Sequence, residues 1–357
     1  MTIPESSADG AVLPKPGPAP IIVEVARGSR VESRHRVACA IVEAGDEGTV
    51  AAWGDTDRPV YPRSAVKPIQ ALPFVETGAA DAYGLGPAEI ALACASHNGE
   101  PAHVELVRAW LGRLGLAEEA LECGVHPPLH EPAARALAAA GESPGPAHNN
   151  CSGKHAAMLT TALHLGEDPR GYAASAHPVQ RRVARALADM AGCRIDDEAA
   201  GVDGCSLPTY ALPLVGVARA MARLAAPRGL GEARADTCRR VTEAMAARPD
   251  LVAGHRRACT AIIEATGGRV LVKTGAEGVY AAAVPGMELG LALKVEDGAG
   301  RAAEVAVIAA LAHVGALEPE ALTRLLPFAA PVLRNHRGFV VGAVRVAGPG
   351  SASGGGV

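Results

Sequence analysis

The spacing of apolar residues divides this chain into strand-forming ends and a helix-forming middle. Runs rich in β-branched residues, bounded by Gly, Asp or Pro, lie at 21–26, 36–42, 49–53, 269–274, 278–284 and 289–295. From about residue 64 to residue 266, apolar residues instead recur every three or four positions, which is typical of amphipathic helices. The clearest helical segments are 101–115, 131–140, 153–166, 178–191, 210–225 and 231–247.

This order predicts a mixed α/β (α+β) fold, in which an antiparallel sheet built from both ends of the chain is flanked by helices. We expect the sheet lobe at 21–62 and 267–347, including an Ala-rich helix at 302–314 and a last strand at 338–346. The α-helical lobe inserted into it is expected at 63–266.

The chain has 357 residues, enough for two domains or one two-lobed domain with a core that needs no disulfides. Hydrophobic residues make up 49% and charged residues 20%, which is typical of a folded protein. Residues 1–20 and 348–357 are rich in Pro, Gly and Ser, and we expect them to be loose tails without catalytic residues.

The charge balance argues against nucleic-acid binding. The chain has 34 Lys and Arg against 38 Asp and Glu, a formal net charge of −4, so there is no excess of cations to neutralise phosphates. Aromatic residues are only 3% of the chain, which also removes the stacking platforms that single-strand binders use.

Eight cysteines occur in a chain whose first 20 residues lack the basic and apolar regions of a signal peptide. We therefore expect a cytoplasmic protein with reduced thiols, in which grouped cysteines indicate metal binding or reactivity. No apolar stretch approaches the roughly 20 residues needed to cross a bilayer, so no membrane partner is expected.

Ser64 and Lys67 form the first chemical motif. If a helix begins here, their side chains share one face and the amine reaches the hydroxyl, as a base reaches its nucleophile. The base must be neutral, and lowering an ordinary lysine pKa of about 10.4 to about 7 costs about 5 kcal/mol, which burial and a second cation together can supply. The alternative is a helix-capping serine followed by a solvated lysine.

Two further motifs strengthen the catalytic interpretation. Ser96-His97-Asn98 follows an apolar run, and Lys273-Thr274-Gly275 ends a predicted strand. With Ser64-x-x-Lys67 they give, in chain order, the three-part signature of serine acyl-transferases of the β-lactamase and penicillin-binding-protein type. In this interpretation Ser96 relays protons, Lys273 supplies a second amine and Asn98 orients the substrate.

Five longer motifs resemble the asparaginase II family, the L-asparaginases of the Rhizobium etli type. They are Arg63-Ser64-Ala65-Val66-Lys67-Pro68, Cys94-Ala95-Ser96-His97, Asn149-Asn150-Cys151-Ser152-Gly153-Lys154-His155, Asp203-Gly204-Cys205-Ser206-Leu207-Pro208 and Lys294-Val295-Glu296-Asp297-Gly298. The resemblance covers about residues 21 to 347. It implies hydrolysis of L-asparagine to aspartate and ammonia, a fold similar to serine β-lactamases and glutaminases, and usually a homodimer. It also implies two Ser–Lys tandems, Ser64 with Lys67 and Ser96 with Lys273.

The same resemblance implies that Cys151, Lys154 and Cys205 bind zinc near the active site, with a structural or modulatory role. Their spacing alone indicates a metal only weakly, although a thiolate at a helix N-terminus is stabilised and two thiolates with a third ligand suit Zn²⁺. The alternative is two buried thiols in the core. No organic cofactor is expected.

Asparagine carries a carboxylate, an ammonium and an amide, and three residues suit these groups. Arg63 has the planar guanidinium that binds a carboxylate, and Asp203 has the charge that holds an ammonium. His155 has a ring that donates to the substrate or orients Asp203.

These residues predict an amidohydrolase that forms an acyl-enzyme through a lysine-activated serine, with either Ser64 or Ser96 as the nucleophile. Three alternatives stay open at this point. They are a β-lactamase-like acyl-transferase, a zinc-dependent amidohydrolase with a metal-bound hydroxide, and a non-catalytic amino-acid-binding protein.

Overall fold

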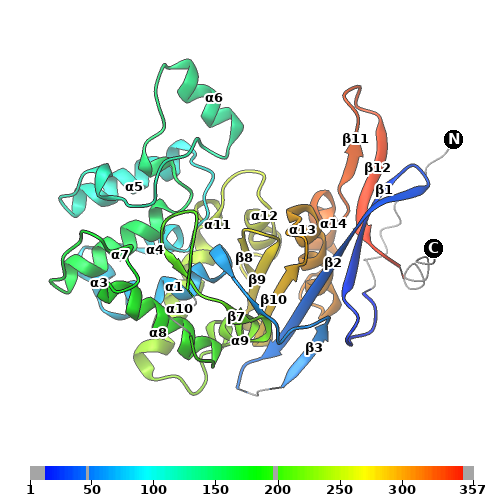
Figure 1. Ribbon diagram of the computed structural model, residues 1–357, viewed down its shortest axis with the longest axis horizontal. Coiled ribbons are helices and arrows are strands. Elements are labelled where there is room, and N and C mark those ends of the chain that lie inside the picture. Colours follow the sequence, from blue (N-terminus) through cyan, green and yellow to red (C-terminus); the bar gives the residue numbers. More distant parts are fainter. Residues whose placement is uncertain (1–12, 46–47, 196–199, 349–357) are drawn as a thin grey trace.

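The computed structural model describes residues 13–45, 48–195 and 200–348, and an antiparallel sheet drawn from both ends of the chain lies at its centre (Figure 1). Its strands are β1 (Ile21–Arg27), β2 (Arg30–Glu43), β3 (Thr49–Trp53), β8 (Leu271–Gly275), β9 (Val279–Val284), β10 (Leu289–Val295), β11 (Val332–Arg334) and β12 (Val340–Val346). They are ordered β11-β12-β1-β2-β10-β9-β8, and β3 pairs with β2. The predicted strands are thus confirmed, whereas the short edge strand β11 was not predicted.

The helices are α1 (Lys67–Gln70), α2 (Leu72–Glu76), α3 (Ala79–Ala82), α4 (Pro87–Ala93), α5 (Pro101–Arg113), α6 (Glu131–Ala139), α7 (Ser152–His164), α8 (Pro178–Ala191), α9 (Leu214–Ala225), α10 (Glu232–Ala247), α11 (Pro249–Val252), α12 (Ala258–Ala265), α13 (Gly300–His313) and α14 (Pro319–Ala329). Short 3₁₀ helices are η1 (Arg63–Val66), η2 (Glu118–Ala120), η3 (Pro146–His148) and η4 (Pro285–Met287). Two small strand pairs join β4 (Pro59–Val60) to β7 (Leu212–Pro213) and β5 (Gly201–Val202) to β6 (Pro208–Thr209). The predicted helical segments are confirmed, and α3, α4, α11, α12 and α14 are additional.

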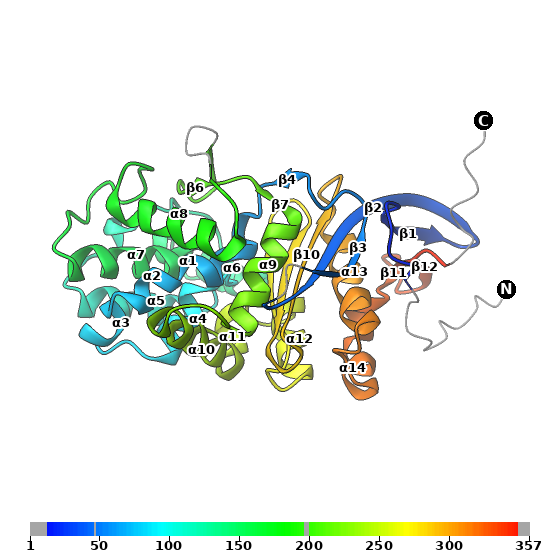
Figure 2. The same cartoon turned by 90° about the horizontal axis from the view of Figure 1, so that it is seen from below.

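The sheet is covered on both faces, which explains the apolar composition of its central strands. Every residue of β9 is buried, and β10 is buried except at Lys294. Helix α9 packs against β10, β2 and β9, while α13 packs against β10 and β12 (Figure 2). Because neither face of these strands meets water, their apolar residues are continuous rather than alternating.

The helical lobe lies on the α9 side of the sheet, and one hydrophobic core runs through both (Figure 2). Helix α7 is its central element, with nearly every residue from Ser152 to Ala162 buried. Helices α4, α5 and α8 pack around α7. Polar residues within this buried helix therefore need partners inside the protein, and Lys154 and His155 find theirs in Cys205 and Tyr172.

Residues 13–20 differ from the loose tail that we expected. Leu13 is buried, the indole of Trp53 donates to the carbonyl oxygen of Pro14 at 2.8 Å, and Gly17 pairs with Trp53. The Pro-rich segment is held because it covers a buried tryptophan. The predicted tails at 1–12 and 349–357 lie outside the described residues.

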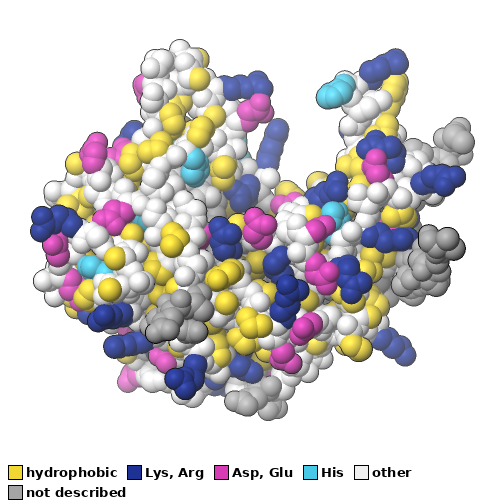
Figure 3. Space-filling view, viewed as in Figure 1, with side chains coloured by type: hydrophobic (Ala, Val, Ile, Leu, Met, Phe, Trp, Pro, Cys, Tyr) yellow, Lys and Arg dark blue, Asp and Glu magenta, His cyan; other side chains and the backbone are white. Residues whose placement is uncertain are grey.

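Charged side chains of both signs are interspersed on the face of the molecule seen in Figure 3. Ion pairs at the surface of the described residues include Arg170 with Asp168 and Arg240 with Asp81. Among the described helices, none is both long and apolar enough to cross a membrane.

Candidate active site

The segment that carries Ser64 and Lys67 is an irregular helix rather than a regular one. Pro68 and Pro73 lack amide donors, and the chain here forms η1, α1 and α2 in succession. The amide of Lys67 donates to the carbonyl of Ser64 in a 3₁₀ turn. Ser64 and Lys67 are thus one 3₁₀ turn apart, and the contacts of the Lys67 amine are made with Ala95, Ser96 and Asn150.

Lys67 and Lys273 converge on the hydroxyl of Ser96. The Nζ of Lys67 lies 3.0 Å from Ser96 Oγ, and the Nζ of Lys273 lies 2.8 Å from the same oxygen. Lys67 also donates to the carbonyls of Ala95 and Asn150, and Lys273 donates to that of Thr274. The structure therefore brings three of the four predicted catalytic groups into direct contact.

Both amines are held in a state that favours loss of their charge. Burial lowers the pKa of Lys273 well below its usual range, and the nearby cation of Lys67 lowers it further. Burial also lowers the pKa of Lys67, and Lys154 adds to this effect although the sulfur of Cys151 opposes it. An ammonium has no acceptor, so a hydroxyl between two amines passes a proton onward only if one amine is neutral.

Ser64 is the most accessible of these four groups. Lys67, Ser96 and Lys273 are buried, whereas Ser64 is partly exposed. Gly275 is the last residue of β8, the strand that carries Lys273, and β8 packs against the turn η1 that carries Ser64. A Cβ at Gly275 would lie 2.6 Å from the carbonyl oxygen of Pro62 and 3.1 Å from the amide of Ala65. Only glycine lets β8 approach η1 so closely.

Two surface cavities lie outside the cluster formed by Lys67, Ser96 and Lys273. One, of about 320 Å³, is lined by Arg58, Tyr61 and Lys294 among others. The second, of about 500 Å³, is lined by His255 and Arg257 among others. Neither is lined by Ser96 or by the two amines, which are too buried to form an open wall.

Arg63 and Asp203 form an ion pair next to Ser64. The Nε and Nη2 of Arg63 lie 2.8 and 2.6 Å from Oδ1 of Asp203. Burial opposes ionisation of Asp203, but Lys154 and Arg63 outweigh it and lower the pKa of this carboxyl. Arg63 has a φ of 53°, in the left-handed region that is costly for a residue with a side chain. From the sequence we expected Arg63 to bind the carboxylate of asparagine and Asp203 to bind its ammonium, whereas in this structure the two side chains bind each other.

His155 is buried in α7, and only one of its two ring nitrogens has a hydrogen-bond partner among the described residues. Its Nδ1 lies 2.6 Å from the hydroxyl of Tyr172, which also accepts from the amide of Glu122. Burial lowers the pKa of His155 well below its usual range, so the ring is neutral. Its Nε2 is buried without a hydrogen-bond partner among the described residues. The free nitrogen is therefore available to a ligand, while Nδ1 pairs with Tyr172 rather than with Asp203.

Cys151, Lys154 and Cys205 meet beside Lys67. The Nζ of Lys154 lies 3.4 Å from the sulfur of Cys205, and both cysteines are buried. The hydrogen bond from Cys205, and then the charges of Lys67 and Lys154, hold the pKa of Cys151 well below its usual range. The same bond raises the pKa of Cys205. In this pair the hydrogen bond and the nearby amines favour ionisation of Cys151 over ionisation of Cys205.

The donor atoms of this cluster suit zinc once the two cysteines and Lys154 are deprotonated. Two sulfurs and a nitrogen are ligands that Zn²⁺ accepts, and metal binding displaces ligand protons. Burial favours a lower pKa of Lys154, but the two cysteines have the larger combined effect and raise this pKa. Of the three ligands, the Lys154 amine is therefore the one that resists deprotonation. Among the described residues, no group of three or more His, Cys, Asp and Glu forms an alternative site. Zinc here would require Lys154.

A sequence profile of the L-asparaginase II family matches residues 23–346, nearly the whole chain. The chain belongs to the L-asparaginase II family. This membership supports an amidohydrolase acting on a small molecule. No sequence among the curated proteins matches this family member.

Three crystal structures of a protein named Mglu are similar to this L-asparaginase II family member. The native form is 17% identical over 80% of this chain and 65% of that chain, with a TM-score of 0.45. The native form in 4.3 M NaCl is 16% identical over 80% of this chain and 62% of that chain, with a TM-score of 0.44. The tris and glutamate form is 16% identical over 80% of this chain and 60% of that chain, with a TM-score of 0.46. This chain thus spans less than two thirds of the length of those crystallised chains.

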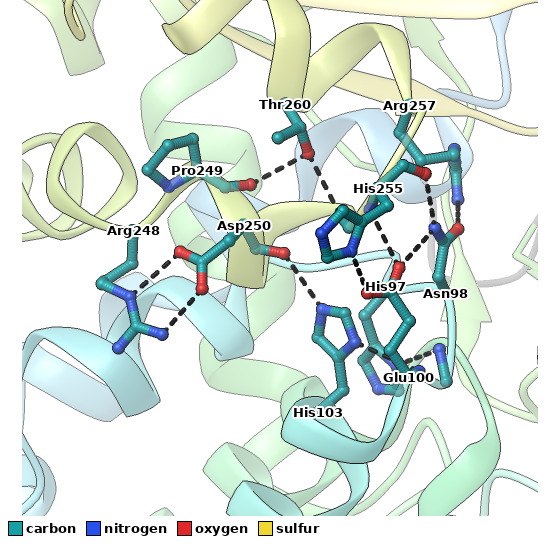
Figure 4. A network of polar contacts seen from close by, with 12 residues as sticks. His97, Asn98, Glu100, His103, Arg248, Pro249, Asp250, His255, Arg257 and Thr260 are labelled. Atoms are coloured by element: carbon teal, nitrogen blue, oxygen red, sulfur yellow. Dashed lines mark hydrogen bonds and ion pairs between the residues drawn. The ribbon is translucent and has the colours of Figure 1, made fainter. Parts of the chain in front are cut away.

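The structure also places residues at the site that the sequence motifs did not predict. Tyr172 fixes the His155 ring, and Arg257 donates to the carbonyl of Ser96 at 3.3 Å. Asn98, expected to orient the substrate, instead accepts from Arg257 at 2.9 Å (Figure 4). Neither Tyr172 nor Arg257 lies in a motif with recognisable spacing, so no signal in the sequence identified them.

Proposed function

We propose that this L-asparaginase II family member hydrolyses L-asparagine to L-aspartate and ammonia through an acyl-enzyme on a lysine-activated serine. The observation that carries the proposal is the position of Ser96 Oγ within 3.0 Å of two buried amines whose pKa values are lowered. A hydroxyl in this position moves protons between two bases, which is the task that amide cleavage requires.

Ser64 is the nucleophile in this mechanism. Its partly exposed hydroxyl gives its proton to neutral Lys67 and attacks the side-chain amide carbon of asparagine, while backbone N–H groups stabilise the oxyanion. Lys67 passes this proton to the pair of Ser96 and neutral Lys273, which delivers it to the amide nitrogen; the C–N bond breaks, and ammonia leaves. Water then attacks the ester, one of its protons passes through Lys67 to Ser64, and aspartate is released.

Arg63, Asp203 and His155 bind the substrate in this proposal. Arg63 binds the α-carboxylate and Asp203 binds the α-ammonium, so the ion pair between them opens to admit a zwitterion of matching charges. The free Nε2 of His155 contacts the substrate. This pairing of charges favours a free amino acid over a peptide amide.

Zinc, if bound, is held by Cys151, Lys154 and Cys205. Its positive charge next to Lys67 would favour the neutral form of that amine. The serines and lysines supply the nucleophile and the bases, so the role of the metal is modulatory. The serine β-lactamase-like fold, the homodimer and the cytoplasmic location stay predictions from the sequence and its resemblance.

A coupled ammonia assay on the purified protein tests this function. We expect turnover of L-asparagine above that of L-glutamine and D-asparagine, and loss of turnover in Ser64→Ala and Ser96→Ala variants. Mass spectrometry of quenched Ser96→Ala should show whether an acyl group is retained on Ser64. Normal turnover in Ser64→Ala would remove the basis of the proposal, and rapid cephalosporin hydrolysis would favour a β-lactamase.

A further inference from the structure

Ser96 lies on a loop after α4, and its position depends on a second loop far away in the sequence. The amide of Ser96 donates to the carbonyl of Val252 at 3.1 Å, and its carbonyl accepts from Nη1 of Arg257 at 3.3 Å. Both backbone groups of Ser96 are thus held by the 252–257 segment, which joins α11 to α12. The hydroxyl of Ser96 is contacted by Lys67 and Lys273, as described above.

Asn98 fixes the guanidinium of Arg257 in turn. Its Oδ1 accepts from Nη1 of Arg257 at 2.9 Å, and its Nδ2 donates to Glu100 at 2.9 Å and to the carbonyl of His255 at 3.0 Å. Both Nδ2 protons and the carbonyl oxygen of this buried amide are therefore used. With no free donor to offer a substrate, Asn98 is a structural link between the two loops.

Glu100 joins the two loops from below (Figure 4). One carboxylate oxygen accepts from Asn98 and from the amide of His255 at 2.8 Å, while the other lies 2.5 Å from Nδ1 of His255. Gly254 has a φ of 109°, and a Cβ there would lie 2.5 Å from this carboxylate. The loops approach too closely at this point for any side chain.

We propose that Arg257 is a positioning residue for Ser96, and that Asn98 and Glu100 hold it in place by tying the 96–100 loop to the 252–257 loop. This inference rests on the proposed function of the Ser96 hydroxyl. The guanidinium binds the Ser96 carbonyl and the Asn98 side chain with one nitrogen, so the loop carrying Ser96 moves if the guanidinium is lost. Ser96 Oγ then leaves its position between the two amines.

Steady-state kinetics of Arg257 variants test this role. We expect Arg257→Met to lower kcat by about 100-fold with KM within about threefold, because displacement of a catalytic group by about 1 Å costs about that much. Arg257→Lys keeps the charge and a donor and should recover kcat to within about tenfold of the parent. Arg256→Met is the matched control, because Arg256 is exposed and outside the network, and it should leave both constants unchanged.

Hydrogen exchange of the peptide covering 95–100 tests the link independently of the reaction. Arg257→Met and Glu100→Gln should both increase exchange at this peptide, and Arg256→Met should not. Unchanged exchange, or loosened exchange with parental kcat, would overturn the positioning role. A parent protein that binds L-asparagine but releases no ammonia would instead contradict the proposed function, and the exchange result would still decide whether the two loops are tied.

Discussion

The amine of Lys273 lies 2.8 Å from the hydroxyl of Ser96, although the two residues are 177 positions apart in the sequence. The amine of Lys67 lies 3.0 Å from the same oxygen. The chain has only five lysines, and Lys67, Lys154 and Lys273 are all buried at this one site. Burying three amines together is costly for folding, and such costs are concentrated where function requires them.

Replacing Lys273 by Met should lower activity without harming the fold. We expect kcat for ammonia release to fall by about 10²- to 10⁴-fold, the usual contribution of a general acid or base. The melting temperature should stay equal or rise, because an apolar side chain is easier to bury than an amine. Lys294→Met, on the half-buried lysine of β10, is the control and should keep parental kcat. A similar loss in both variants would contradict a specific role of Lys273.

The activity should be lost on acidification. Burial lowers the pKa of Lys273 well below 10.5, so the amine is neutral in the folded protein at pH values where it is charged in the unfolded chain. The proposed mechanism needs the neutral form, so kcat/KM should hold well below pH 10.5 and fall as the pH drops through the folded pKa.

The free energy of unfolding should also fall on acidification, because the pKa of Lys273 is lower in the folded protein than in the unfolded chain. The contribution of Lys273 is complete above the unfolded pKa and is lost progressively as the pH falls to the folded one. Melting curves of the parent and of Lys273→Met across this pH range isolate the contribution of Lys273 to stability.

The pH profile of kcat/KM tests the same lowered pKa. A kcat/KM that keeps rising to pH 10 would mean that Lys273 titrates as an ordinary exposed lysine.

Removal of metal should reduce activity without abolishing it. Dialysis against a chelator should lower kcat by about 10- to 100-fold at most, the range found when groups outside the reacting atoms are lost. Cys205→Ser should lower the zinc content measured by elemental analysis, because it removes one of the two sulfurs of the cluster. Complete and zinc-reversible loss would instead favour a metal-bound hydroxide as the nucleophile.

A methyl group at Gly275 should displace the turn that carries Ser64. Its Cβ would lie 2.6 Å from the carbonyl oxygen of Pro62, so β8 and η1 must separate in Gly275→Ala. We expect a loss of about 1–3 kcal/mol in stability together with a fall in kcat. Gly286→Ala meets no heavy atom within 4 Å and is the control. Parental kcat in Gly275→Ala would show that the turn tolerates displacement.

Local sequence patterns predicted the secondary structure well because its causes are local. The β-branched runs at both ends form the central sheet, and the three- and four-residue periodicity of the middle forms α5 to α10. At Ser64 and Lys67, where the sequence suggested the start of a helix, the chain forms η1, α1 and α2 in succession. The prediction of a loose tail at 13–20 was wrong, because this Pro-rich segment is held by contacts with Trp53, which is distant in the sequence.

Short-range patterns in the sequence identified the candidate groups: a Ser-x-x-Lys spacing, a Lys at a strand end and a Cys-x-x-Lys spacing at the start of a helix. How these groups are combined depends on tertiary packing: both amines contact Ser96, Arg63 pairs with Asp203, and Arg257 binds the carbonyl of Ser96. These contacts join segments that are far apart along the chain. Their geometry depends on how the sheet and the helical lobe pack together, and no local spacing records that packing.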